Sequence, residues 1–501
     1  MVMSKSHLTP FLKRCFIQAQ EPSSVGRRAF LRKGTMAAAA LALPLIRCSE
    51  KNPVVCIVGG GLAGLSAGHE LKKAGVPFTL YEASGRLGGR TFTITDAVVD
   101  GAWVDFGAEY VDSTHLQLIS LATELGVTLT DLRSDPLASK TFHFEGRKIT
   151  EQELVDALAP FASAIEADIA TLPEELHYKN AEAFRRLDNL SISDYLKEKG
   201  ITGWMYRFLD MALVAEYAMA SEEQSALNLL VLLSTPIRYD QHYHLFGAEH
   251  EVMKIKGGTS ALSEALAATI TDSIRTGWAL KKITKEGEQQ YLTFDSPEGE
   301  RIIAADLVIL AIPLPVLRTI ERNFRFPERK ERSIAETGFG NAAKVAMGFS
   351  SRPWREQGFQ GYTFTDVNDT VIWDSTQGVD IPGGSLTFIG GGKISDEFLN
   401  LSYADINTRW LEGAENIYPG VRAAYNGRIS KFCWAVNPLA GGSYTCYRKG
   451  QWSEFFGVDG EPFGNILFAG EHCSMEFQGY MNGAIESGQQ AAKAVVNLMK
   501  S

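Results

Sequence analysis

Residues Val54 to Gly75, VVCIVGGGLAGLSAGHELKKAG, constrain the fold more than any other stretch of the sequence. A short β-branched run leads into Gly59, Gly61 and Gly64 in a G-x-G-x-x-G pattern, and an alanine-containing helical segment follows. In such a strand, turn and helix, the glycines let backbone amides approach a pyrophosphate at the positive N-terminus of the helix. The stretch predicts a dinucleotide-binding α/β domain of the Rossmann type.

A second short apolar run, residues 78–81, ends at Glu82. At this distance beyond the glycine turn, a carboxylate at the end of the second strand accepts hydrogen bonds from a ribose. Together the two features predict a dinucleotide site and leave both NAD and FAD open.

The residues after Glu82 favour FAD. They place Arg86, Gly88, Gly89 and Arg90 in one run, GRLGGR. Nicotinamide enzymes have no use for a second glycine pair with flanking arginines. A flavin nucleotide, whose pyrophosphate is wrapped more fully, uses an arginine such as Arg90 against phosphate and the glycines for close approach.

This combination resembles the flavin-containing amine oxidase superfamily, which includes monoamine oxidases, polyamine oxidases and L-amino-acid oxidases, in its exported bacterial form. Further blocks match the family in order along the chain, and ordered blocks are far more specific than one motif. These blocks are Lys256-Gly257-Gly258, the expected strands within 274–283 and 305–313, and residues 465–495.

The resemblance implies an α/β architecture with a discontinuous Rossmann-like FAD-binding domain and an α+β substrate-binding domain. The FAD-binding domain is expected over residues 53–127, 247–318 and 437–498. The substrate-binding domain is expected over the helix-rich residues 128–246 and over 319–436.

Contacts to FAD are implied from all of these blocks. Glu471 is expected to face the ribitol, and the backbone near Leu280 to meet the adenine. The helix that opens at Met481 is expected to face the flavin ring, where its N-terminus would stabilise the negative charge of a reduced flavin. The other expected cofactor contacts are Ala63, Gly107, Ala108, Trp434 and Ala484.

Residues 434–445, WAVNPLAGGSYT, resemble the monoamine-oxidase segment in which a tryptophan and a cysteine meet the flavin. Ser443 stands at the position of the tethering cysteine. A hydroxyl cannot form the thioether, so noncovalent FAD is predicted. Cys446, which follows shortly after, is expected to point elsewhere.

Three residues are expected to be catalytic. Lys344 lies in a strand-like stretch whose apolar residues alternate on the opposite face. The matching family lysine hydrogen-bonds a water near flavin N5 and helps reoxidation, while a solvated strand face is the alternative. Tyr444 and Tyr480 match the two family tyrosines that guide an amine by cation–π attraction, with ordinary core packing as the alternative.

The implied reaction removes a hydride equivalent from the carbon next to a neutral amine, and water then hydrolyses the imine to an aldehyde or keto acid. Oxygen or a membrane quinone is expected to take the electrons. Two other classes share the FAD motifs: a desaturase or porphyrinogen-type oxidase acting on C–C bonds, and a nonenzymatic FAD-binding protein. Neither would need the tyrosine pair or Lys344.

The segment GAEYVDS suggests which amine is used. Tyr110 stands where typical L-amino-acid oxidases carry an arginine for the carboxylate, while Glu109 and Asp112 would favour a substrate with a second positive charge. Such a substrate is a polyamine or a basic amino acid. The alternative is that Asp112 or Ser113 caps the following helix and that Glu109 faces solvent. An unplaced arginine could still bind a carboxylate; the candidates are Arg238, Arg352 and Arg448.

Composition narrows the partners. The formal net charge is −10, from 49 Lys and Arg against 59 Asp and Glu, which argues against a nucleic-acid or anionic-membrane partner. The six cysteines form no C-x-x-C pair and no cluster with metal-ligand spacing, so no metal site is predicted. Pairing among Cys433, Cys446 and Cys473 stays open, and no oligomeric state is predicted.

The first 52 residues are read as a leader. SSVGRRAFLRKGTMAAAALALPLIRC has a basic flank with Arg27 and Arg28, followed by an apolar run too short to span a bilayer. It closely resembles a twin-arginine export signal, which implies a periplasmic protein. An amphipathic or disordered leader is the alternative. Lipidation at Cys48, which would attach the chain to a membrane, is disfavoured because Arg47 stands where a small residue is expected.

Overall fold

The computed structural model describes residues 53–138, 140–234 and 251–500. The expected export signal therefore lies outside the described residues, as does Arg238.

The glycine-rich motif belongs to a five-stranded sheet in which every neighbouring pair is parallel. The strand order is β10, β2, β1, β14 and β21. Their bounds are Ile274–Thr276, Phe78–Glu82, Val55–Val58, Leu307–Leu310 and Ile466–Phe468. The expected strand, turn and helix over 54–75 is confirmed, because β1 leads through the glycines into α2 (Leu62–Lys73).

Side-chain alternation along β1 explains the two layers that cover this sheet. Val55 and Ile57 pack on the helical side. Cys56 and Val58 face a second, four-stranded sheet. The helical layer contains α2, α3 (Leu116–Glu124), α9 (Ser260–Ala268) and α17 (Met481–Leu498). The four-stranded sheet contains β13 (Gly299–Ala305), β12 (Gln289–Ser296), β11 (Ala279–Glu286) and β15 (Glu321–Arg322).

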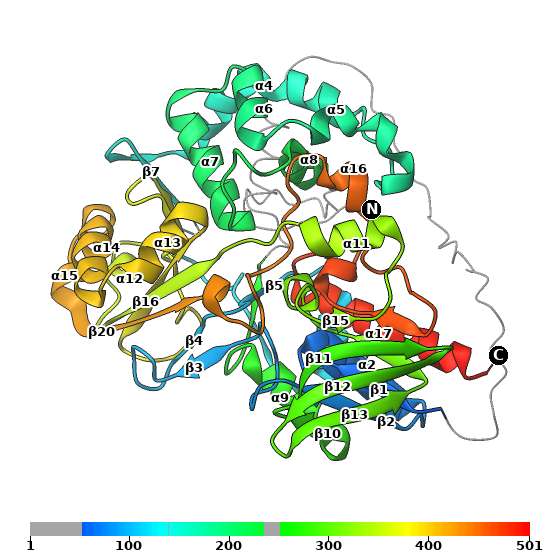
Figure 1. Ribbon diagram of the computed structural model, residues 1–501. Coiled ribbons are helices and arrows are strands. Elements are labelled where there is room, and N and C mark those ends of the chain that lie inside the picture. The colour runs from blue at the N-terminus through cyan, green and yellow to red at the C-terminus, as the bar shows by residue number, and fades with distance from the viewer. Residues whose placement is uncertain (1–52, 139, 235–250, 501) are drawn as a thin grey trace.

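The first and last described helices of this region, α2 and α17, lie side by side (Figure 1). Their close approach depends on Gly488, where a Cβ atom would come 2.2 Å from the carbonyl oxygen of Ala63. The C-terminal block is thereby held against the nucleotide motif, although most of the chain separates the two.

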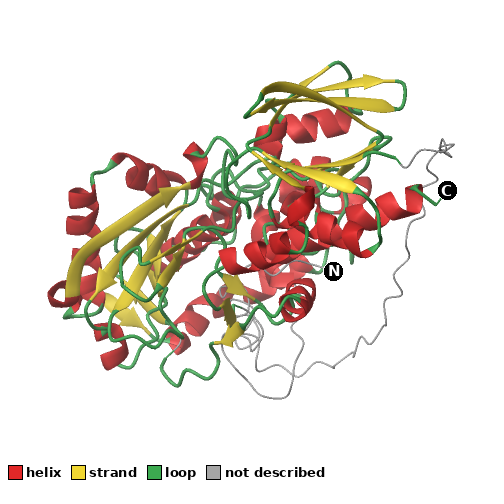
Figure 2. Cartoon of the chain, turned by 90° about the horizontal axis from the view of Figure 1, so that it is seen from below, coloured by secondary structure: helices red, strands yellow, loops and turns green. Residues whose placement is uncertain are grey.

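A seven-stranded sheet forms the other half of the molecule, and the strands gather in two separate groups in Figure 2. Its neighbours are antiparallel except for β17 and β7. The order is β20 (Tyr425–Cys433), β16 (Ala343–Phe349), β19 (Gly384–Gly390), β18 (Thr370–Asp374), β17 (Thr363–Thr365), β7 (Thr141–Phe144) and β8 (Arg147–Ile149).

Helices cover both faces of the seven-stranded sheet. One layer packs against alternate residues of β16 and contains α12 (Pro353–Glu356), α13 (Gly392–Asn400), α14 (Tyr403–Ile417) and α15 (Val421–Ala424). The other comes from the expected helix-rich segment and contains α4 (Glu151–Ile169), α5 (Arg185–Asp188), α6 (Ile192–Glu198), α7 (Gly203–Tyr217) and α8 (Ala226–Ser234). Thr150 and Glu153 start α4 with a capping box.

Short elements connect the two halves. Two small sheets pair β3 (Thr93–Thr95) with β4 (Trp103–Asp105), and β9 (Met253–Ile255) with both β5 (Tyr110–Val111) and β6 (Leu129–Asp131). Strand β15, which follows the expected domain boundary at residue 318, still pairs with β11 of the four-stranded sheet. The proposed division into domains stays a prediction.

The remaining short helices are α10 (Leu314–Leu317), α11 (Glu328–Glu336), α16 (Gln451–Phe455) and the 3-10 turns 178–183, 271–273, 434–436 and 471–473.

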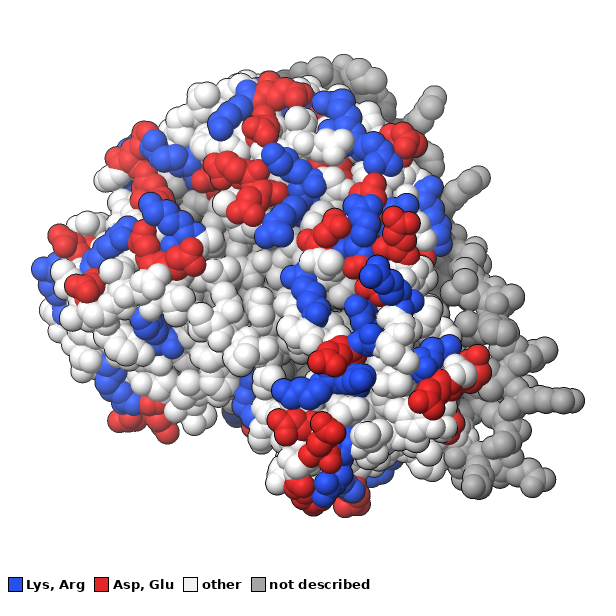
Figure 3. All heavy atoms as spheres, viewed as in Figure 1, with Lys and Arg blue, Asp and Glu red and all other residues white. Residues whose placement is uncertain are grey.

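Within the described residues, no helix combines the length and apolar character that crossing a membrane requires. On the face shown in Figure 3, acidic and basic side chains are interspersed over both halves. The negative net charge is therefore not gathered into one patch on that face.

Candidate active site

Two positions of the turn after β1 and the first turn of α2 require glycine. Gly59 has φ +109°, and a Cβ there would lie 2.4 Å from the carbonyl oxygen of Ala311. At Gly64 a Cβ would lie 1.9 Å from the carbonyl oxygen of Gly59, so the first turn of α2 packs directly on the loop. Both glycines are required by close backbone approach, as the motif predicts.

The second glycine turn, at Gly88 and Gly89, packs against the first glycine turn, at residues 59–61. The amide of Gly88 donates to the carbonyl oxygen of Gly60 over 2.8 Å, and Gly88 and Gly89 both have positive φ. Arg86 holds this turn by donating to the carbonyl oxygens of Leu87, Gly89 and Thr91.

Glu82 lies at the end of β2, next to both glycine turns. Its Oε2 accepts the amide of Gly60 over 2.6 Å, and its Oε1 accepts the amide and hydroxyl of Ser84 over 2.8 Å. The carboxylate therefore lies at the place where the sequence predicts ribose recognition.

Glu471 joins three segments of the site. Its Oε1 accepts Nη1 of Arg90 over 2.8 Å and the amide of Thr445, and its Oε2 accepts the amide of Gly479. Arg90 also donates to the carbonyl oxygen of Ser443. Arg90 thus ties the second glycine turn to the C-terminal block, and its expected contact with phosphate stays a prediction.

Tyr444 and Tyr480 lie in the same wall as Glu471. Tyr480 caps the N-terminus of α17 without a side-chain hydrogen bond to it. Burial raises the pKa of both phenols well above the usual value, and the carboxylate of Glu216 raises both further. Both phenols are therefore neutral, and both lie within the electrostatic influence of the Glu216 carboxylate.

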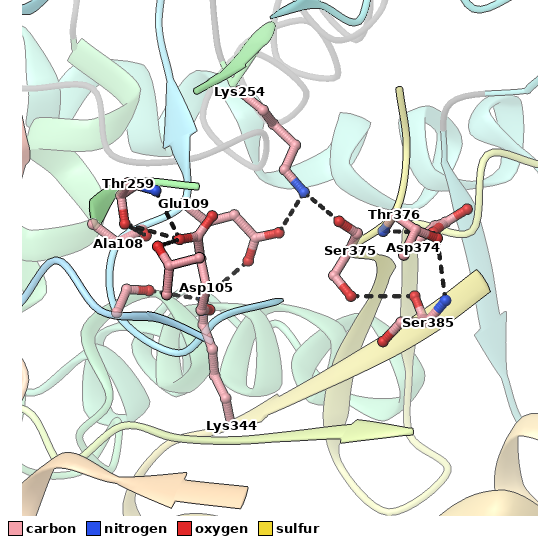
Figure 4. A network of polar contacts seen from close by, with 12 residues as sticks. Asp105, Ala108, Glu109, Lys254, Thr259, Lys344, Asp374, Ser375, Thr376 and Ser385 are labelled. Carbon is pink, nitrogen blue, oxygen red and sulfur yellow. Dashed lines mark hydrogen bonds and ion pairs between the residues drawn. The ribbon is translucent and has the colours of Figure 1, made fainter. Parts of the chain in front are cut away.

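Lys344 lies on the face of β16 opposite the apolar residues that pack on α13 and α14, as the alternation predicts. It is buried rather than on a solvated strand face. Its Nζ donates to the carbonyl oxygens of Asp105 and Gly107, both over 2.8 Å, and to Oε2 of Glu109 over 3.1 Å (Figure 4).

Glu109 lines the cavity, and its expected role as a substrate carboxylate stays a prediction. The alternative that it faces solvent is wrong, because only 5% of the residue is exposed. Its Oε1 accepts Nζ of Lys254 over 2.8 Å, and its Oε2 accepts Lys344. Burial acts to raise the pKa of Glu109, but the two ammonium groups hold that pKa below its usual value. The carboxylate is committed to these lysines.

Asp112 and Tyr110 remain at the cavity wall. Asp112 is buried, and its Oδ1 accepts the amide of Glu251 over 2.7 Å. Helix α3 begins after His115 without a side-chain cap, so the alternative role of Asp112 or Ser113 as a cap is wrong. Tyr110 packs edge-on against Trp373.

The sequence reasoning missed several residues of the site, among them Glu216, Glu251, His472 and Lys254. Glu216 lies in the last turn of α7 and lines the cavity. An acid there opposes the helix dipole, and this was a readable signal that the position serves something other than helix stability. Lys254 has no comparable signal, because its partners lie far away in the sequence.

Two of the unplaced arginines are remote from the site. Arg352 donates to the carbonyl oxygens of Val379, Ile381 and Gly383. Arg448 forms an ion pair with Glu223 near the surface. Among the described arginines only Arg86 and Arg90 line the cavity. Arg86 holds the second glycine turn, and Arg90 is paired with Glu471.

One cavity of about 760 Å³ runs between the two halves and brings these groups together. Every predicted site residue lines it except Gly64, which packs beneath the turn. Three buried polar atoms of the wall have no hydrogen-bond partner in the described structure: Nδ1 of His472, Oη of Tyr480 and Nε1 of Trp373. Burial lowers the pKa of His472 to about 4, so its neutral ring can hydrogen-bond a bound molecule. The residues present therefore fit a flavin dinucleotide.

The family model for flavin containing amine oxidoreductases matches residues 62–496. The chain belongs to this family. It is therefore an FAD-dependent oxidoreductase that acts on amines, and the flavin amine oxidase architecture expected from the sequence is confirmed.

Two curated relatives and one solved structure illustrate the range of the family. A flavin-containing amine oxidase of Danio rerio is 25% identical over 467 residues, covering 89% of this chain and 86% of the relative. An L-amino acid dehydrogenase of Synechocystis is 24% identical and covers 88% and 94%. A putrescine oxidase bound to putrescine has a TM-score of 0.78 at 21% identity, covering 89% of this chain and 99% of that one.

The cysteines near the flavin position agree with the reading of Ser443. Ser443 lines the cavity, whereas Cys446 lies outside it with its Sγ 3.7 Å from Sδ of Met219. Cys433, Cys446 and Cys473 are thiols and do not pair with one another.

Acid precipitation of the purified protein is expected to release its FAD, because no thiol lies where the flavin would be tethered. The measurement is the flavin absorbance of supernatant and pellet, with a heat-denatured sample at neutral pH as control. A yellow pellet that keeps its flavin through washing would contradict noncovalent binding.

Proposed function

We propose that this protein oxidises a small amine carrying a second positive charge, such as a diamine or polyamine. The observation that carries the proposal is the position of Glu216 and Asp112 near the tyrosine pair, with Glu251 next to Asp112. All three line the cavity, and the charges of Glu216 and Asp112 reach the phenol of Tyr480. Carboxylates so placed favour a cation at this end of the cavity.

The tyrosine pair would orient the reacting nitrogen. Two electron-rich rings attract an amine and leave little room for its hydration shell. FAD, when bound, supplies the redox chemistry by accepting a hydride equivalent from the carbon next to nitrogen. The lone pair of that nitrogen assists only when the amine is neutral, so the rate of flavin reduction should rise with pH through the pKa of the bound amine.

A basic L-amino acid is the second candidate. It is supported by the similarity to an L-amino acid dehydrogenase, and it too carries a second positive charge. Against it stands the engagement of both described arginines at the cavity, because Arg86 holds the second glycine turn and Arg90 is paired with Glu471. The tyrosine pair and Lys344 weigh against a C–C desaturase and a nonenzymatic FAD protein.

Export to the periplasm by the twin-arginine route is part of the proposal, and the leader sequence supports it. This route carries proteins already folded around a cofactor. Oxygen or a membrane quinone would then accept the electrons. The relatives carry both the name oxidase and the name dehydrogenase, so they do not decide between these acceptors.

The proposed reaction is tested by anaerobic titration of the oxidised protein, followed by its visible spectrum. Diamines and polyamines are expected to bleach the flavin, with aromatic monoamines and neutral L-amino acids much slower. Bleaching by L-arginine or L-lysine alone would favour the second candidate, and no bleaching by any amine would overturn amine oxidation.

Replacing both tyrosines tests the cation–π role. Tyr444→Leu with Tyr480→Leu should lower kcat/KM at least on the order of tenfold, because both ring faces are lost. The matched Tyr444→Phe, Tyr480→Phe variant keeps the rings and should retain most of the activity. Unchanged turnover in the leucine variant would remove the proposed role.

Glu216→Gln should raise KM for a diamine on the order of tenfold while changing KM for a monoamine of similar length little. The matched control is Glu222→Gln, because Glu222 is exposed and outside the cavity. Equal effects on both amines, or none, would show that Glu216 does not select the second charge.

Changing Arg27 and Arg28 to Lys should trap the full-length protein in the cytoplasm, because the twin-arginine route depends on that pair. Cell fractionation and immunoblotting would measure this. Periplasmic protein at the level of the parent chain would exclude the route.

A further inference from the structure

Glu109 lies between two lysines that come from different parts of the fold. Each lysine takes one carboxylate oxygen, with Oε1 at 2.8 Å from Nζ of Lys254 and Oε2 at 3.1 Å from Nζ of Lys344. Figure 4 shows the two lysines reaching the carboxylate of Glu109 from different sides. The exposed fractions of the side chains alone are 2%, 3% and 8% for Glu109, Lys254 and Lys344, so water screens these charges little.

The two lysines are held in different ways. The three acceptors of Lys344 match the three N–H bonds of an ammonium group. Lys254 lies on β9, directly across from Tyr110 of β5, and also donates to the carbonyl oxygen of Ser375 over 2.6 Å. Lys344 lines the cavity and Lys254 lies behind it.

This arrangement matters because a single carboxylate would otherwise cancel the charge of Lys344. A pair of one ammonium and one carboxylate presents little net field to its surroundings. With a second ammonium, the group formed by Glu109, Lys254 and Lys344 has one net positive charge. Two further carboxylates lie nearby, and hydrogen bonds from neutral donors do not cancel a charge. Asp105 accepts from Thr93 and Thr259, and burial together with the charge of Glu109 raises its pKa, which favours its neutral form. Asp374 accepts from Trp354 and Thr376. Tyr110 and Tyr362 face the same region, and burial raises the pKa of both phenols, so they are neutral.

We propose that Lys254 is a positioning residue for the flavin chemistry. By holding and neutralising Glu109, it keeps the positive charge of Lys344 uncancelled at the cavity wall. That charge would stabilise the negative charge that a reduced flavin acquires. The inference rests on FAD lying in this cavity, and it gives Glu109 a place in the cofactor environment instead of in substrate recognition.

The test is the midpoint potential of bound FAD, measured by anaerobic dye-equilibrated reduction of the holoprotein. Lys254→Met removes a positive charge and should lower the potential. Glu109→Gln removes a negative charge and should raise it. Each change should alter the equilibrium between oxidised and reduced flavin about tenfold, in opposite directions. Combining the two restores the local charge and should return the potential close to that of the parent.

Two controls separate charge from structure. Lys256→Met removes the same charge from the exposed end of the same segment and should not shift the potential. Lys254→Arg keeps the charge and should stay near the parent value. Should Lys254→Met fail to fold, the shift in Glu109→Gln and its reversal in the double variant still decide the matter, because replacing a buried ion pair together is well tolerated.

Shifts of the same sign in Lys254→Met and Glu109→Gln, or none in folded FAD-loaded variants, would overturn the proposal. These outcomes leave amine oxidation untouched, since they concern protein that binds FAD and is bleached by amines. A parent protein that binds no FAD or is not bleached would instead count against the proposed function.

Discussion

A buried carboxylate is the constraint on which the active site depends. Taking the charge of Glu109 out of water is costly unless it is paired and hydrogen-bonded. Lys254 and Lys344 meet that need from two separate strands, β9 and β16. Because Lys344 also donates to the backbone at Asp105 and Gly107, and Lys254 to Ser375, the charged cluster ties the nucleotide side of the molecule to the seven-stranded sheet. The cavity lies between the two halves that these bonds join.

The opposite end of the cavity is set by contacts that need no charge. Gly59, Gly64 and Gly488 each have a carbonyl oxygen where a Cβ would be, so the motif turn, α2 and α17 are pressed together. This places the N-terminus of α17, beside Tyr480, in the wall of the same cavity that Gly59 and Glu82 line. The fold therefore joins the nucleotide turn and the tyrosine pair through backbone packing, while the ion pairs fix the lysine between them.

Local constraints were readable from the sequence and distant ones were not. The first glycine turn, β1 and β2 were predicted because their residue types follow from backbone geometry within a few positions, and α17 was predicted from the family resemblance of its block. The ion pairs of Glu109 were not predicted because its partners are 145 and 235 residues away in the chain. A carboxylate in a polar loop looks the same whether it meets a substrate or a lysine, and only packing decides. Glu216 was missed for the same reason, although its place at the negative end of α7 marked it as unusual.

The charges of the cavity act in opposite senses on the two nitrogens of a diamine. Negative charge from Glu216 and Asp112 favours the protonated form of a nitrogen lying beside them. This suits the second nitrogen of the diamine, which is recognised by its charge and does not react. Hydride loss instead needs a neutral nitrogen, and a positive charge at the wall disfavours protonation of an amine near it. Lys344, kept uncancelled by Lys254, would supply that charge on the flavin side. The same positive charge that would stabilise a reduced flavin would therefore also lower the pKa of the reacting amine, so one arrangement of three buried groups would serve both halves of the redox step.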